Sequence, residues 1–265
     1  MDYGLFNGKI TAGEAGEEHF QLHGHQHWLT AGLRPIPTTV LSTTNSCVSH
    51  HPSVKLLKFA DDTTMVGLIT RGDESTYRGE IERLQSWCNV NNLELNALKT
   101  VEMVVDFRKD PVPHLPLMLG DTRVEVVESC RFLGMVISRD LKWELNISTL
   151  LRKAQQRMYF LRQLRKYRLS RTMMSRFYSA IVESILTHSI ITWFPAAAAK
   201  DLTKLQRVIR SAERVIGRPL PSLTSLHDSR ALKRARKIMA DPSHPGHPGS
   251  LWEEGAAAQD QNRAT

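Results

Sequence analysis

The sequence predicts an α+β fold, in which a mostly antiparallel sheet with one helix precedes a basic helical bundle. Between Ser53 and Ile137, short apolar runs are separated by turn residues, which is typical of strands. From Asn146 onward, apolar residues instead recur every three or four positions, which is typical of amphipathic helices. Strands followed by a run of helices indicate the α+β class.

Four segments follow from these patterns. We expect a weakly ordered leader, a sheet domain, a basic helical region and a disordered tail, over residues 1–41, 42–145, 146–240 and 241–265. The leader has little periodicity and carries four histidines. They could ligate a metal, but no carboxylate or cysteine pattern supports them, so we favour a leader without a site. These histidines are His19, His23, His25 and His27.

The sheet domain begins with two apolar runs on either side of Asp61 and Asp62. Because the runs are strand-like and Asp is common in turns, we expect both carboxylates at the tip of a β-hairpin. Two adjacent carboxylates repel each other, and the repulsion raises the pKa of one unless a cation lies between them. Mg²⁺ prefers such hard oxygen ligands. The alternative interpretation is an ordinary polar turn.

One helix and further strands should follow the hairpin. Asp73 is a candidate N-cap, and the apolar face of the helix consists of Tyr77, Ile81, Leu84 and Trp87/Cys88. Asn91 and Asn92 should end this helix. The later strands are predicted at residues 101–107, 123–127 and 132–137.

The helical region should contain four helices. The first has Leu150, Ala154, Met158, Leu161 and Leu164 as its apolar face. The second should begin at Ser170–Arg171 and be broken by Pro195. The third and fourth are expected over residues 202–212 and 222–239.

The three cysteines, Cys47, Cys88 and Cys130, form neither a zinc pattern nor a disulfide framework. We therefore expect free thiols in a reducing intracellular compartment, nuclear or cytoplasmic.

The start, Met1 to Lys9, lacks the apolar stretch of a signal peptide. No apolar run reaches the roughly 18 residues that a membrane helix needs, so we expect no membrane partner.

Charge is distributed very unevenly. Residues 151–240 carry 20 Lys and Arg against 4 Asp and Glu, whereas residues 1–150 carry 14 against 19. Concentrated cationic charge indicates a polyanionic partner. The candidate phosphate-binding residues are Lys153, Arg157, Arg162, Arg165, Lys166, Arg207 and Arg210. The alternative is that they form ordinary solvated helix faces.

Taken in order, several motifs resemble the C-terminal palm and thumb of a non-LTR (LINE-type) retrotransposon reverse transcriptase, an RNA-directed DNA polymerase. They are Phe59–Asp62 (catalytic hairpin), Asn92–Asn96 with Lys99–Thr100 (the next palm motif), Phe132–Gly134 with Leu141–Trp143 (primer grip), and the helical stretches Lys153–Arg162 and Phe177–Ile181. The resemblance covers about three quarters of the chain, residues 42–239.

This resemblance implies roles for particular residues. Asp61 would ligate Mg²⁺ with support from Asp62, in the two-metal chemistry of nucleotide addition. Lys99 would protonate the pyrophosphate leaving group or balance its charge. Phe132, Leu133 and Gly134 would form the primer grip, and the basic helices would contact RNA or DNA backbones. The alternative interpretation, without the resemblance, is that Lys99 is a solvated surface lysine and that Phe132 and Leu133 pack in the core.

Other expected parts of that family are not recognisable in residues 1–52: an upstream catalytic carboxylate, template-holding fingers and a Gly-rich nucleotide-checking turn. A two-metal site that lacks one ligand loses much of its charge compensation. We therefore expect a truncated and inactive fragment that retains nucleic-acid binding and takes no small-molecule cofactor.

A second resemblance concerns the helices from Lys153 to Pro195, which are similar to the N-terminal segment of the AlkB homologue 8 family of alkylated DNA repair proteins. That family implies Fe²⁺/2-oxoglutarate and methyltransferase chemistry. The sequence contains no His-x-Asp iron pair and no Gly-x-Gly loop, so the resemblance brings no catalytic residues. A third hypothesis is a host-adopted nucleic-acid-binding module that uses the basic helices alone.

Overall fold

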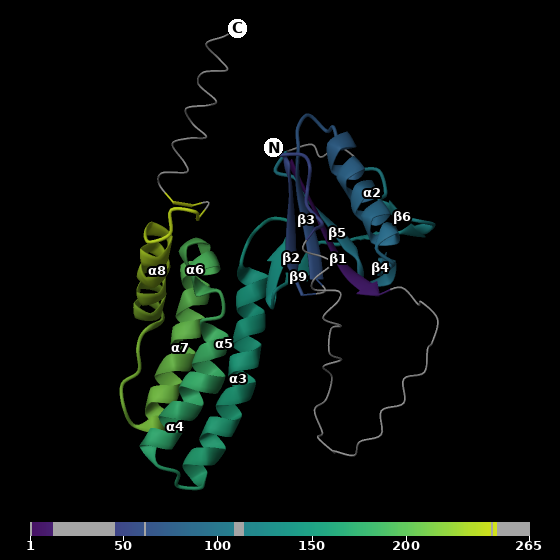
Figure 1. Cartoon of the computed structure of the whole chain (residues 1–265). Helices are drawn as coiled ribbons and strands as arrows, with labels where there is room; N and C mark the ends of the chain where they lie inside the picture. The colour runs from purple at the N-terminus through teal and green to yellow at the C-terminus, as the bar shows by residue number, and fades with distance from the viewer. Residues whose placement is uncertain (1, 13–45, 61, 109–113, 245, 248–265) are drawn as a thin grey trace, which may run out of the picture. The chain divides into compact units, whose positions relative to one another are not determined.

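The computed structural model describes residues 2–12, 46–60, 62–108, 114–244 and 246–247. The chain forms two compact units, residues 1–141 and 142–265 (Figure 1). The first unit is built on a sheet, and the second is helical. The predicted α+β class is therefore confirmed.

The sheet of the first unit has the strand order β2-β3-β1-β5-β8, and β4 pairs with β1. All of its pairings are antiparallel except the one between β5 and β8. Its strands are β1 (Asp2–Ala12), β2 (Val54–Phe59), β3 (Asp62–Ile69), β4 (Leu93–Leu95), β5 (Val101–Val105) and β8 (Glu125–Val126).

Strand β1 was not expected from the sequence. It lies between β3 and β5, and its register pairs Leu5 with both Val66 and Met103. Glycines at positions 4 and 8 lower the strand propensity of this segment. Its pairing partners are also far away in the chain, so no local pattern indicates it. The remainder of the predicted leader, residues 13–41, and its histidines lie outside the described residues.

Helix α2 (Ser75–Val90) packs on one face of this sheet through the side chains that the sequence predicted. Tyr77, Ile81, Leu84 and Cys88 are buried there with Met65 of β3. The predicted N-cap, Asp73, is off by one residue, since the N-cap is Glu74. Asp73 nevertheless accepts a hydrogen bond from the Ser75 backbone amide (2.9 Å), so it still satisfies a free N–H at the helix start.

Smaller elements complete the first unit. They are the 3-10 turn η1 (Ala97–Lys99) and the strands β6 (Met118–Leu119), β7 (Thr122–Arg123), β9 (Ser129–Phe132) and β10 (Met135–Ser138). Strands β9 and β10 form a hairpin, and Cys130 of β9 packs with Met103 and Val105 of β5. Because neighbouring strand residues point to opposite faces, Glu102 lies on the face that α2 covers.

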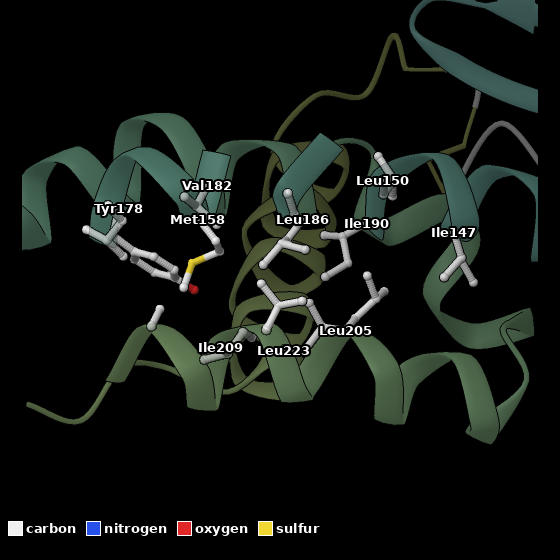
Figure 2. Packing of buried hydrophobic residues seen from close by; sticks show 14 of the residues in the cluster. Ile147, Leu150, Met158, Tyr178, Val182, Leu186, Ile190, Leu205, Ile209 and Leu223 are labelled. Carbon is white, nitrogen blue, oxygen red and sulfur yellow. The ribbon is translucent and has the colours of Figure 1, made fainter. Parts of the chain in front are cut away.

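The second unit is a helical bundle. Its elements are α3 (Glu144–Lys166), α4 (Arg171–Phe177), the π turn η2 (Tyr178–Glu183), α5 (Ser184–Leu186), α6 (Ile190–Trp193), the 3-10 turn η3 (Phe194–Ala196), α7 (Ala199–Ile216) and α8 (Leu223–Met239). Figure 2 shows Tyr178, Val182, Leu186 and Ile190 packed over Ile209 of α7 and its neighbours. No described helix is long and apolar enough to cross a bilayer.

The second predicted helix is interrupted before Pro195. A π turn follows α4, α5 ends at Leu186, and Ser189 takes a left-handed conformation (φ 49°) just before α6 begins. Buried residues recur here every four positions, and in a plain α-helix each such step turns about 40° past a full rotation. The wider π turn compensates for that drift and keeps Tyr178 and Val182 in the core.

Candidate functional site

The predicted Asp-Asp hairpin is present in the first unit. Strands β2 and β3 are in register, with Phe59 opposite Asp62, so two residues connect them. Ala60, the first of these, has a φ of 55°. A positive φ is typical of the tight turns that join two-residue hairpins. Asp61 lies outside the described residues, so the structure describes only Asp62 of the predicted pair.

A pocket of about 200 Å³ adjoins the tip of this hairpin. Its walls come from the hairpin and from β9 with its turn: Leu57, Lys58, Phe59, Asp62, Thr64, Arg131, Phe132 and Leu133. The turn after β9 consists of Leu133 (φ 46°) and Gly134 (φ 85°), which is the conformation of a two-residue hairpin. The fold thus places Asp62 in one pocket with the predicted primer-grip residues Phe132 and Leu133.

Lys99 lies at the same end of the sheet. Asn7 of β1 pairs with Thr64 on one side and with Val101 on the other, and Lys99 precedes Val101 by two residues. Two strand spacings, or about 10 Å, separate such positions across a sheet. The Lys99 side chain is exposed, and it is not among the described residues that line the pocket. The Asn96 side chain caps the 3-10 turn η1 by accepting a hydrogen bond from the backbone amide of Lys99 (3.1 Å).

The described residues of the pocket include one of the two predicted magnesium ligands, Asp62. Nowhere in the described part of the chain do three or more His, Cys, Asp or Glu side chains gather as metal ligands. Asp62 also shares its pocket with two cations, Lys58 and Arg131, which would repel a divalent ion. Because Asp61 lies outside the described residues, magnesium ligation by Asp61 and Asp62 stays a prediction.

The second unit contains a larger groove between α3 and α7, about 410 Å³ in volume. It is lined by Leu151, Gln155, Met158 and Arg162 of α3 and by Lys204, Arg207, Val208 and Ser211 of α7. Met158 and Val208 are buried and belong to the apolar core beneath. Three cationic side chains from two helices therefore converge on a groove with an apolar base.

The cations of the groove differ in their pairing. Lys204 forms a 2.7 Å ion pair with the buried carboxylate of Asp201. Arg162 and Arg207 are exposed and form no ion pair with any described carboxylate. Two positive charges on facing helices are thus left without compensation, which favours an anion between them.

Of the seven predicted phosphate-binding residues, the structure brings Arg162 and Arg207 together. Arg165 instead donates to the Val215 carbonyl (2.6 Å) and so joins α3 to the end of α7. The others, Lys153, Arg157, Lys166 and Arg210, are exposed and do not line the groove. Lys204 was not among the predicted phosphate-binding residues, although its position three residues before Arg207 places both on one helix face.

Comparisons with known proteins give three results. A family model described as "Alkylated DNA repair protein alkB homolog 8, N-terminal" matches residues 143–184, which hold α3, α4 and η2. No curated protein matches the chain. Among solved structures, telomerase from Candida albicans in complex with a fragment of telomeric RNA is similar at 12% identity and a TM-score of 0.27, over 72% of this chain.

These results support the AlkB homologue 8 resemblance and give no support to the reverse-transcriptase resemblance. The matched segment is only residues 143–184 of 265, so it does not by itself define the family of the whole chain. This chain spans 31% of the telomerase chain, and the TM-score is too low to indicate a shared function.

Proposed function

We propose that the protein binds nucleic acid through its helical unit, with a phosphate backbone in the groove between α3 and α7, and that it catalyses no reaction. The observation that carries this proposal is the convergence of Arg162 and Arg207 without a described carboxylate partner. Lys204 adds a third donor at the same edge, although Asp201 offsets part of its charge.

The physical basis is the electrostatics of the backbone. Each phosphate that an arginine or lysine neutralises releases condensed counterions, and this release favours binding irrespective of base sequence. Guanidinium groups also donate two parallel hydrogen bonds to phosphate oxygens. The groove presents two such groups from facing helices, and a backbone that passes between them can contact both.

The family match supports the same function by an independent route. Its segment, residues 143–184, includes the α3 wall of the groove with Gln155 and Arg162. The matched family is named for alkylated DNA repair. Since the chain has neither a His-x-Asp pair nor a Gly-x-Gly loop, we propose that it shares with that family a non-catalytic helical module.

We further propose that the first unit is the remnant of a reverse-transcriptase palm. Its support is the pocket in which Asp62 meets Phe132 and Leu133, with Lys99 at the same end of the sheet. We propose that polymerase activity is absent, because no second carboxylate joins Asp62 among the described residues that line this pocket. Primer extension with Mg²⁺ and dNTPs that disappears in Asp61→Ala would contradict this inactivity.

The binding proposal is tested on the full chain by fluorescence anisotropy with fluorescein-labelled 20-base-pair DNA and a 20-nucleotide RNA across a salt titration. The double variant Arg162→Gln/Arg207→Gln should weaken binding. On duplex DNA it should also reduce the slope of log K against log salt by about 1.8, since each phosphate contact contributes about 0.9. The matched control is Arg176→Gln/Arg218→Gln, which removes two exposed cations outside the groove.

Equal losses in both double variants would show that diffuse charge, and not the groove, binds the backbone. Binding that does not respond to salt would contradict the proposal altogether. Iron-dependent consumption of 2-oxoglutarate by the chain would contradict the non-catalytic assignment and favour enzymatic AlkB chemistry.

A further inference from the structure

Helix α3 exposes two neighbouring aromatic rings on its solvent side. Tyr159 is 56% exposed and Phe160 is 47% exposed. Their ring centroids lie 5.5 Å apart at an interplanar angle of 77°, so the rings meet edge to face. The helix is anchored by its opposite side, where Leu150, Ala154 and Leu161 are buried. The two rings are therefore not needed for the core and are free to contact a ligand.

Tyr159 lies next to the basic groove. It follows Gln155 by four residues and precedes Arg162 by three, and both of these line the groove. Residues three and four apart are neighbours on a helix surface, so Tyr159 sits at the α3 rim. Phe160 belongs to the adjacent stripe with Arg157. Its edge-to-face contact restricts the orientations that the tyrosine ring can take.

We propose that Tyr159 stacks on an unpaired base of a single-stranded nucleic acid whose backbone lies in the α3–α7 groove, and that Phe160 positions its ring. This inference rests on the proposed function and specifies its ligand. A duplex covers the faces of its bases, whereas a single strand exposes them to aromatic side chains. Aromatic stacking beside a cationic track is the general means by which single strands are held.

The charge around the rings argues against a second copy of the chain as the occupant. Arg152 and Arg162 lie seven residues before and three residues after Tyr159, and Arg157 lies three residues before Phe160. All three are exposed and have no ion pair among the described residues. Two such surfaces placed face to face would repel, while a polyanion is attracted.

The experiment compares fluorescein-labelled (dT)12 with a 12-base-pair duplex on the full chain, by anisotropy. Tyr159→Leu should weaken (dT)12 binding between about fivefold and about 150-fold, the range measured for loss of one stacked base. Its salt slope should not change, because no phosphate contact is lost. Duplex binding should stay within about twofold, and Tyr159→Trp should retain single-strand affinity.

The matched control is Tyr167→Leu, which removes a more exposed tyrosine (74%) at the C-terminal end of α3, outside the groove lining. It should leave (dT)12 affinity unchanged. A loss as large as that of Tyr159→Leu would overturn the placement of the stacked base. An equal loss for duplex and single strand, or no loss for either, would overturn stacking itself.

The two proposals fail in different ways. If Arg162→Gln/Arg207→Gln still weakens binding while Tyr159→Leu changes nothing, only the stacking inference is overturned. If neither probe binds in a salt-sensitive manner, the proposed function fails first. Sedimentation of the ligand-free chain addresses self-association, and a change caused by Tyr159→Leu would assign the rings to a contact between copies and overturn the inference.

Discussion

Gly67 offers a sharp test of how α2 packs on the sheet. It lies within β3, opposite Val54 of β2. A Cβ added at Gly67 would lie 2.5 Å from Tyr77 Cδ2 and 3.1 Å from Tyr77 Cβ and Cγ. The ring cannot swing away, because Tyr77 is only 2% exposed. Gly67→Ala should therefore destabilise the first unit by about 1–3 kcal/mol, the usual cost of overpacking.

Gly79→Ala is the matched control. Nothing lies within 4 Å of a Cβ at Gly79, which is in the interior of α2. Alanine is favoured over glycine inside a helix, so this change should stabilise the unit by about 0.5–1 kcal/mol. The two substitutions have the same chemistry and opposite expected signs, which separates packing from propensity.

Hydrogen exchange followed by mass spectrometry reports on each unit separately. In Gly67→Ala, the protected amides of β3 and α2 should exchange between about fivefold and about 150-fold faster, and those of α3 and α7 should not change. Unaltered exchange in β3 and α2 would refute the packing argument. It would mean that Tyr77 does not occupy the position opposite Gly67.

Three further predictions concern buried groups. Burial raises the pKa of Glu102 above 4.5, with Arg78 opposing the shift. The folded state thus holds this proton more tightly than the unfolded state, and the associated stability is lost as the pH rises from about 4.5 through the raised pKa. Glu102→Gln should reduce this loss in urea unfolding at pH 4.5 and pH 7.5, and an unchanged pH dependence would contradict the assignment. Leu161 is fully buried, so Leu161→Ala should cost about 2–5 kcal/mol in urea unfolding; a loss below about 1 kcal/mol would contradict its place in the core. Burial raises the pKa of the Cys88 thiol to about 12, so iodoacetamide should label it only after denaturation, and rapid labelling of the native chain would contradict its burial.

Local patterns predicted much of the fold and part of the candidate site. The spacing of apolar residues indicated the buried faces of α2 and α3, and the residues around Asp62 indicated a hairpin. These features depend on neighbours a few positions away, because helix and strand periodicities are local properties. The excess of cations in residues 151–240 was likewise visible in the sequence.

The sequence by itself determined the buried faces of α2 and α3, the hairpin around Asp62 and the region where positive charge is concentrated. Only the tertiary structure decided that β1 enters the sheet between β3 and β5, that Glu102 is buried beneath α2, and that Arg162 and Arg207 face one groove. Strand order and side-chain convergence join residues that are distant in the chain. Their geometry is set by the packing of whole elements, for which no local pattern carries a signal.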